Sequence, residues 1–89
     1  MITLVVYDIS DTKLRNKVAE ILKDWGLKRI QYSAFIGDLT SQERRDLAEF
    51  LRRLKLSERD KIDIFPICIR DLKLHIRVVK EEVRHERIP

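Results

Sequence analysis

The chain has 89 residues, enough for one domain and too few for two separate hydrophobic cores. Hydrophobic residues make up 44% of it and charged residues 38%, a balance that excludes an intrinsically disordered protein. No apolar stretch approaches the roughly 20 residues of a membrane-spanning helix. Residues 1–3 also lack the basic start of a signal peptide, so we expect a cytoplasmic protein with no membrane partner.

The net charge of +4 and the pI near 9.5 favour an anionic partner. The basic residues are spread along the chain without a basic block, so binding nucleic acid would require folding or dimerisation to gather residues such as Arg15, Lys17 and Arg29. The single cysteine, Cys68, lies in the apolar run 64–69 and is expected to be a buried apolar residue.

The first predicted element is a buried strand over residues 2–7, which are apolar and rich in β-branched side chains. Asp8 follows directly, so a lone carboxylate would stand at the rim of the sheet, where folds of this kind tend to place ligands. Asp8 is therefore a candidate metal or catalytic ligand. An Asp there is also typical of a helix cap or turn, a role for which Ser10 and Asp11 compete.

A helix is predicted over residues 11–25, because its apolar residues recur at helical spacing and Gly26 follows. Residues 27–39 then alternate with a period of two, typical of strands, and thirteen residues is long for one strand. We therefore expect a bend or hairpin between residues 33 and 37 that divides this segment into two strands.

Thr40 and Glu43 form a capping-box pattern that predicts the start of a second helix. The predicted buried face of this helix consists of Leu47, Phe50, Leu51 and Leu54. A polar connector over residues 57–61 leads to a strand over 62–69, in which Pro66 favours an edge position or a bulge. A last strand is expected over residues 74–79, and 80–89 reads as a charged tail that is frayed or ordered by a partner.

The order strand, helix, strand, strand, helix, strand predicts an α+β fold, a ferredoxin-like βαββαβ sandwich with one extra C-terminal strand. Residues 1–79 would form a single domain that includes this last strand. A surplus strand in so small a domain favours pairing with the sheet edge of a second copy. We expect a symmetric homodimer.

Two stretches of the sequence resemble the CRISPR-associated Cas2 family, small endoribonucleases and spacer-acquisition proteins of prokaryotic antiviral defence. The first runs from Val6-Tyr7-Asp8-Ile9 into the helix at residues 14–18, and the second is the glycine, arginine, glutamine-x-serine-x-phenylalanine pattern of residues 26–37. The similarity spans about residues 1–79. It implies a ferredoxin-like dimer in which the last strand of each protomer joins the sheet of the other.

By this resemblance, Asp8 would be the catalytic residue and the Mg²⁺ ligand near the dimer axis. Arg15, Lys17 and Arg29 would bind nucleic acid, and Phe35 would support the site. Lys17 stands where an arginine can occur, and a lysine keeps the charge but loses the bidentate fork for phosphate. For Arg15, Lys17 and Arg29 an ordinary solvated position is an equally good interpretation, while Tyr7 and Phe35 are more typical of core residues than of base-stacking ones.

Hydrolysis of a phosphodiester needs a metal ion that polarises the phosphoryl oxygen and lowers the pKa of the attacking water. One carboxylate anchors Mg²⁺ only weakly, whereas two Asp8 side chains from a dimer, together with substrate phosphate, form a usable site. The two carboxylates would have to lie within about 4–6 Å of a shared ion.

Three hypotheses follow for the function. The first is a spacer-acquisition subunit that is a magnesium-dependent endonuclease for single-stranded RNA, duplex DNA or both. The second is a non-catalytic, architectural DNA-binding dimer that bridges the CRISPR integrase subunit. The third is a toxin-type ribonuclease of similar fold. The sequence shows no base-reading motif that would separate RNA from DNA substrates.

Overall fold

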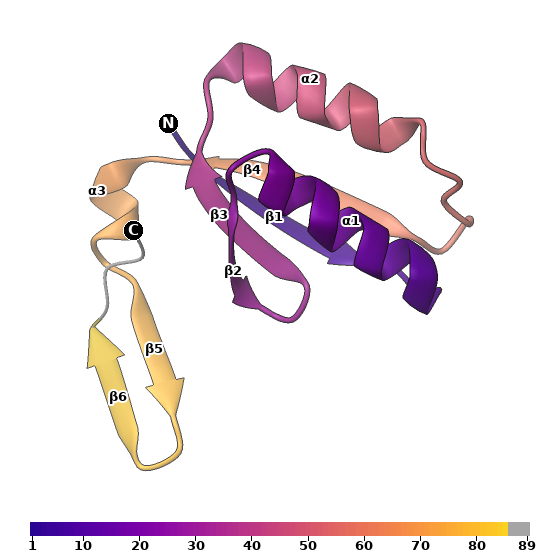
Figure 1. Cartoon of the computed structure of the whole chain (residues 1–89). Helices are drawn as coiled ribbons and strands as arrows, with labels where there is room; N and C mark the ends of the chain where they lie inside the picture. The colour runs from indigo at the N-terminus through magenta and orange to yellow at the C-terminus, as the bar shows by residue number, and fades with distance from the viewer. Residues whose placement is uncertain (86–89) are drawn as a thin grey trace.

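The computed structural model describes residues 1–85 of the chain. A four-stranded sheet carries two long helices, and a short helix and a hairpin follow it (Figure 1). In chain order the elements are β1 (Ile2–Asp8), α1 (Thr12–Asp24), β2 (Lys28–Gln31), β3 (Ala34–Asp38), α2 (Ser41–Arg52), β4 (Lys61–Ile67), α3 (Ile69–Leu72), β5 (Ile76–Val79) and β6 (Glu82–His85). The first six follow the predicted order, so the ferredoxin-like α+β fold is confirmed.

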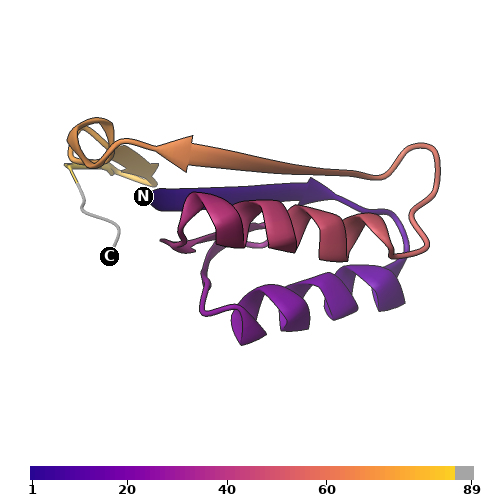
Figure 2. The ribbon, with the colours of Figure 1, turned by 90° about the horizontal axis from the view of Figure 1, so that it is seen from above.

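The sheet has the strand order β2-β3-β1-β4, and its neighbouring strands are antiparallel. Both long helices cover the same face of the sheet (Figure 2). Val5 and Tyr7 of β1 point into the core formed with these helices, where Val18 and Leu47 are fully buried. Because side chains alternate along a strand, Thr3 shares the core face with Val5 and Tyr7, whereas Ile2, Leu4, Val6 and Asp8 lie on the opposite face, which we call the open face.

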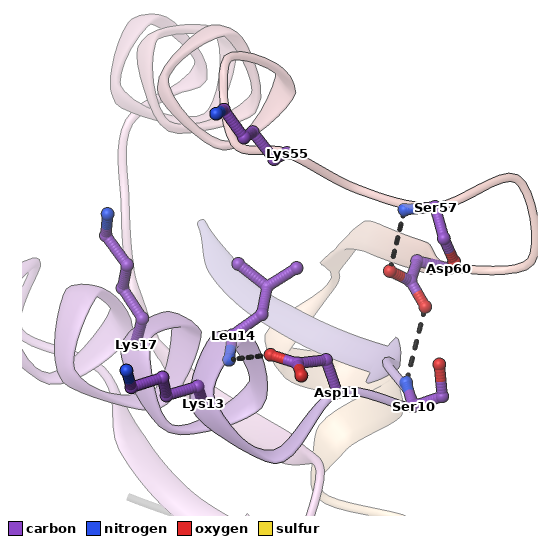
Figure 3. Close-up of a pocket in the computed structure, with 8 residues that line it drawn as sticks. All are labelled: Ser10, Asp11, Lys13, Leu14, Lys17, Lys55, Ser57 and Asp60. Atoms are coloured by element: carbon purple, nitrogen blue, oxygen red, sulfur yellow. Dashed lines mark hydrogen bonds between the residues drawn. The ribbon is translucent and has the colours of Figure 1, made fainter.

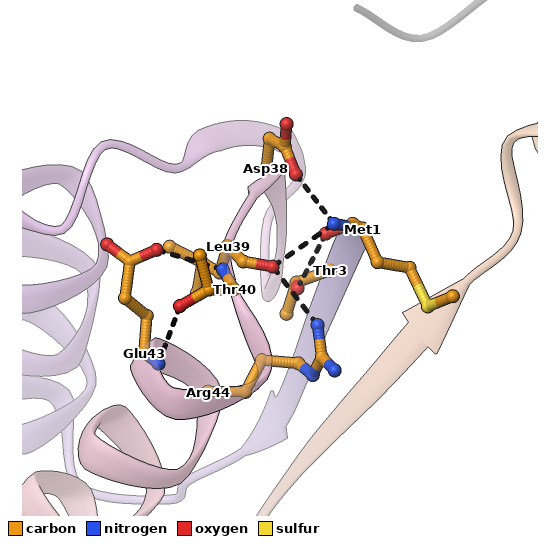
Figure 4. A network of polar contacts seen from close by, with 7 residues as sticks. All are labelled: Met1, Thr3, Asp38, Leu39, Thr40, Glu43 and Arg44. Atoms are coloured by element: carbon orange, nitrogen blue, oxygen red, sulfur yellow. Dashed lines mark hydrogen bonds and ion pairs between the residues drawn. The ribbon is translucent and has the colours of Figure 1, made fainter.

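The ends of both long helices follow from local sequence. The Asp11 carboxylate accepts the backbone N–H of Leu14 at 2.8 Å and caps α1, while Gly26, with φ of +88°, ends the turn after it. Thr40 and Glu43 form the predicted reciprocal capping box at the start of α2 (Figure 4). The capping box predicted the start of α2, while at α1 the structure selects Asp11 from the three cap candidates Asp8, Ser10 and Asp11.

The amino terminus is fastened to the loop between β3 and α2. The Met1 ammonium group donates to Asp38 Oδ1 at 2.9 Å, and Arg44 donates to the Leu39 carbonyl at 3.1 Å (Figure 4). These contacts hold one end of β1 against β3. Asp8 stands at the other end of the same strand.

The expected hairpin within residues 27–39 is present, but its turn lies at Tyr32 and Ser33 and so begins one residue before the expected range of 33–37. The pairing shifts register between Arg29 and Gln31, which marks an irregularity in β2. Gly37 allows the close approach of the preceding segment, because a Cβ there would lie 2.5 Å from Leu27 Cδ2. Burial does not alternate along β3, where Ala34, Phe35 and Ile36 are all buried, so the period of two in the sequence predicted the strands but not which side chains they bury.

Within residues 1–85, strand β4 pairs only with β1 and forms an edge of the sheet, the first of the two alternatives that Pro66 favoured. Two expectations about burial were wrong. Cys68 is exposed, because the apolar run leaves the sheet at Ile67 and Cys68 precedes α3. Phe50 is 47% exposed, because it lies at the border of the buried face of α2, beside Trp25.

The C-terminal region differs most from expectation. The expected last strand is shorter, and α3 precedes it. Residues 82–85, expected in a frayed or partner-ordered tail, form β6, which pairs with β5 in a separate two-stranded sheet. Residues 86–89 of that tail lie outside the described residues. No helix among residues 1–85 is long and apolar enough to cross a membrane.

Candidate nucleic-acid interface

Asp8 is the last residue of β1 and is exposed on the open face of the sheet. Its neighbour across the ladder is Lys61, the first residue of β4. Within residues 1–85 the Asp8 carboxylate makes no hydrogen bond and no ion pair. The helix cap that was its competing interpretation is supplied by Asp11 instead. Asp8 therefore has no structural task that explains a carboxylate at this position.

A single chain does not hold a prepared metal site. Among the described residues no group of three or more His, Cys, Asp or Glu side chains lies close enough to bind one ion. Asp11, the nearest acidic residue in sequence, is committed to the cap of α1. Mg²⁺ prefers several oxygen ligands in an octahedron, so the donors of one chain do not fit it by themselves.

Arg15 of α1 is half-buried and turned toward the loop that follows Asp8. Its guanidinium donates to the Ile9 carbonyl at 3.1 Å and to Thr12 Oγ1 at 3.2 Å, and it reaches the Ser10 carbonyl at 3.5 Å. These bonds satisfy carbonyl groups of the loop between β1 and α1. Arg15 thus positions the segment that carries Asp8, and most of its donors are already in use.

Arg29 has a different environment. It is exposed on β2, and within residues 1–85 it makes no hydrogen bond or ion pair. Its guanidinium carbon lies 5.1 Å from the ring centre of Phe35 and 5.8 Å from that of Tyr32. Such distances are typical of cation–π contacts. Arg29 is held over two rings while its N–H groups remain available for phosphate.

Arg15 and Arg29 are brought together by one aromatic residue that the sequence interpretation did not select. The Arg15 guanidinium carbon lies 5.5 Å from the ring centre of Tyr32, so both arginines contact this ring. We call Arg15, Arg29, Tyr32 and Phe35 the guanidinium–aromatic cluster. Tyr32 is the variable residue after Gln31 in the glutamine-x-serine-x-phenylalanine pattern, so the pattern itself gave no reason to select it.

The core interpretation of Tyr7 and Phe35 is confirmed. Tyr7 is 3% exposed and Phe35 is fully buried, with the two ring centres 6.3 Å apart. Neither ring is open to a base in this structure. Because Phe35 is buried, its ring supports the site through its contact with the Arg29 guanidinium.

Lys17 lies apart from the cluster, in a pocket of about 510 Å³ between the start of α1 and the loop before β4 (Figure 3). Lys13 and Lys55 also line this pocket, and the sequence interpretation missed both because they are distant from each other along the chain. Asp60, which also lines the pocket, connects two loops. Its carboxylate accepts the backbone N–H of Ser57 at 2.9 Å and that of Ser10 at 3.3 Å. The N–H groups of Ser57 and then Ser10 hold the pKa of Asp60 below its ordinary value of 3.8.

Asp8, the guanidinium–aromatic cluster and the lysine-lined pocket lie at the same end of the sheet. The backbone N–H of Tyr7 donates to the Ser33 carbonyl at 3.0 Å, so the turn after β2 lies beside the residue that precedes Asp8. Lys61 lies on the other side of β1 at the same level. An exposed carboxylate, an exposed aromatic ring and several cations are thus placed at one rim, a combination suited to binding and cutting a phosphate chain.

Comparison with known proteins agrees with this arrangement. Residues 1–73 match the family model described as CRISPR associated protein Cas2. A CRISPR-associated endoribonuclease Cas2 of Korarchaeum cryptofilum is 65% identical over 75 residues, which cover 84% of this chain and 81% of the relative. One of Desulforudis audaxviator is 47% identical over 74 residues, which cover 83% and 70% respectively.

Two further relatives differ in kind. A protein of Thermoproteus tenax named CRISPR-associated endonuclease Cas1/endonuclease Cas2 fusion is 40% identical over 78 residues, which cover 88% of this chain and 30% of the fusion. The crystal structure of Streptococcus pyogenes Cas2 at pH 6.5 superposes with a TM-score of 0.68 at 27% identity, covering 76% of this chain and 87% of that one. Sequence and fold therefore point to the same family.

Proposed function

Because the chain belongs to the Cas2 family of CRISPR-associated proteins, we propose that it is a magnesium-dependent endonuclease that acts as a homodimer in spacer acquisition. The observation that carries this proposal is Asp8, an exposed carboxylate without a partner in the described chain, at a rim where cations and an aromatic ring also gather. The similar proteins of K. cryptofilum and D. audaxviator bear the name endoribonuclease, which supports the reaction class.

Two copies of Asp8 would be needed to hold the ion. Among residues 1–85 no group of three or more possible metal ligands lies together, and Mg²⁺ bound by the Asp8 carboxylate and water alone is held weakly. Helices α1 and α2 leave the open face of the sheet uncovered (Figure 2). Asp8 lies on this face, so a second copy packed against it would bring its own Asp8 toward the first. When bound, the ion would polarise the scissile phosphate and lower the pKa of a water molecule.

The remaining groups of the rim would hold the substrate. Arg29, whose N–H groups have no partner within residues 1–85, and the lysines of the pocket in Figure 3 present cations on the surface near the end of β1, which carries Asp8. Arginine and lysine contacts to phosphate fix the register of a nucleic acid without reading its sequence. The substrate would accordingly be chosen by strand geometry, as single-stranded RNA or duplex DNA, more than by base identity.

A specific observation also favours the second candidate, an architectural dimer that holds DNA and bridges an integrase partner. The T. tenax relative carries Cas1 and Cas2 in one chain, which favours a physical association between the two modules. In that case Asp8 would not take part in chemistry, and the cations alone would matter. Membership of the Cas2 family is the reason to set aside the toxin-type ribonuclease.

The test is a cleavage assay of the parent and the Asp8→Asn protein, each purified by the same stringent route, on single-stranded RNA and duplex DNA. Asp11→Asn is the matched control, because it makes the same carboxylate-to-amide change three residues away and Asn is as good a helix cap as Asp. We expect Asp8→Asn to lose cleavage and Asp11→Asn to keep it, with the parent inactive in a chelator of divalent ions.

Equal cleavage by the parent and Asp8→Asn at the same magnesium concentration would contradict the catalytic role of Asp8. Spacer integration in cells separates the two candidates further. If nuclease activity is required for spacer acquisition, the nuclease hypothesis predicts that the Asp8→Asn protein loses integration. The architectural hypothesis predicts normal integration in that variant and a loss when Lys13, Lys17 and Lys55 are replaced together.

A further inference from the structure

Tyr32 is an exposed aromatic residue whose surroundings indicate a ligand-binding position. It is 65% exposed in the turn between β2 and β3, so its ring contributes little to the core. Two guanidinium groups, those of Arg15 and Arg29, lie within 6 Å of its ring centre. Both guanidinium groups lie over the ring as cation–π partners, and Tyr32 is still 65% exposed, so part of its π surface is open next to positive charge.

The chemistry of this pair of features selects the ligand. A cationic ligand would be repelled by the two arginines, and an acidic peptide would gain nothing from the ring. A nucleotide satisfies both, because its base stacks on an aromatic ring and its phosphate pairs with a guanidinium. In a duplex the bases are already stacked on one another, so the faces of the bases are available only in a single strand.

Arg15 and Arg29 have different roles around this ring. Arg15 uses its donors on the carbonyl groups of the loop that follows Asp8 and fixes the position of the ring. Arg29 makes no hydrogen bond or ion pair in the described part of the chain, so its donors are free for phosphate. The hydrogen bond from Tyr7 N–H to the Ser33 carbonyl places the turn beside the end of β1.

We propose that Tyr32 is a stacking site for one base of a single-stranded nucleic acid, with Arg29 binding the adjoining phosphate. This inference rests on the proposed function, since it supposes a nucleic-acid substrate, and adds to it a residue that recognises an unpaired base. A strand bound in this way lies at the same rim as Asp8.

The experiment is a fluorescence-anisotropy titration of the full chain with three labelled probes: a single-stranded RNA, a single-stranded DNA of the same sequence, and the matching DNA duplex. The variants are Tyr32→Phe, which keeps the ring, and Tyr32→Leu, which removes it. Phe50→Leu is the matched control, because it removes another partly exposed ring, on α2. Circular dichroism and sedimentation establish that each variant keeps the fold and the oligomeric state of the parent.

We expect Tyr32→Leu to weaken single-strand binding by about 5- to 150-fold, the loss of one base–aromatic stack. Tyr32→Phe and Phe50→Leu should bind as the parent does, and duplex binding should be unchanged in all variants. An RNA-only or a DNA-only loss identifies the natural strand, and either result supports the stacking site.

Single-strand binding by Tyr32→Leu at the level of the parent would overturn the inference. An equal loss of duplex and single-strand binding would do the same, because Tyr32 would then only position the arginines, and so would a change of oligomeric state. A parent that binds the duplex but neither single strand refutes this inference and leaves the proposed function standing. A parent that binds none of the three probes refutes both.

Discussion

Arg15 and Lys17 lie two residues apart on α1 and carry the same charge, yet the structure gives them different tasks. Arg15 is half-buried and bonded to the loop between β1 and α1, whereas Lys17 is exposed at the mouth of a pocket. A sequence cannot distinguish the two, because the loop carbonyls that Arg15 satisfies are defined only by the folded backbone. The distinction has consequences for stability.

Replacing Arg15 by Ala should lower the free energy of unfolding by about 1–3 kcal/mol, because the Ile9 carbonyl loses a charged donor at 3.1 Å. Lys17→Ala, the matched control, should change it by less than about 0.5 kcal/mol. Urea denaturation of both variants measures the difference. Equal stability of the two proteins would show that the Arg15 hydrogen bonds do not hold the loop.

Asp60 joins the loop before β4 to the loop after β1 and should make stability depend on pH. Its pKa is lowered in the folded protein, chiefly by the Ser57 N–H, so its contribution is complete above pH 3.8 and is lost as the pH falls through the folded pKa. The stability difference between the parent and Asp60→Ala should therefore be present at pH 7 and shrink below pH 3.8. Denaturation curves of the parent and Asp60→Ala at pH 7 and below pH 3.8 test this. A stability difference that does not depend on pH would contradict it.

At the scale of elements, the parts that the sequence predicted are those that local rules determine. The capping residues, the helical spacing of apolar residues and Pro66 in an edge strand all act within a few residues. The elements that were missed are α3, which begins at the end of an apolar run that reads as one strand, and β6, which lies in a charged segment without an apolar pattern. Cys68 was misplaced because apolar composition cannot show where a strand leaves the sheet.

The candidate site was predictable only in part for the same reason. Asp8 could be selected because a charge directly after an apolar strand is visible in the sequence. Tyr32 could not, because its contacts join α1, β2 and a turn through the fold. Lys13 and Lys55 face one pocket although they are far apart along the chain, and only the packing of α1 beside the loop before β4 shows it.

The capping box of α2 gives an element-scale prediction. Thr40→Ala removes the acceptor of the Glu43 N–H at 3.1 Å and should cost about 0.5–2 kcal/mol of unfolding free energy. Ser41→Ala, at the first residue of the helix, makes a similar loss of a hydroxyl without touching the cap and should be nearly neutral. Chemical denaturation compares the two, and equal effects would mean that the cap does not anchor the helix.

At the scale of the whole molecule, a single chain leaves apolar side chains exposed on its C-terminal hairpin. Strands β5 and β6 form their own two-stranded sheet, whose isolated pairing is marginal in water. Val78 and Val83 face each other across this hairpin and are 75% and 59% exposed. Apolar side chains at that exposure on an unsupported hairpin favour a second copy as the partner, in line with the proposed homodimer.

Val78→Lys should therefore weaken self-association by at least about tenfold, because a buried charge at a dimer contact costs more than 1.4 kcal/mol. Residues 1–72 should keep their fold, since Val78 does not contribute to their core. Sedimentation equilibrium measures the change, with Lys80→Ala in the exposed turn as the control. An unchanged dissociation constant, or a parent that is a monomer throughout, would contradict a role of the hairpin in dimerisation.

The central claim is that two Asp8 side chains, one from each protomer, act together in phosphodiester cleavage. The most direct test mixes parent and Asp8→Asn chains in varied proportions, lets the protomers redistribute, and measures the cleavage rate at constant total protein. If both carboxylates are required, the rate falls as the square of the parent fraction. A rate that falls in direct proportion to that fraction, or does not fall at all, would contradict the paired site.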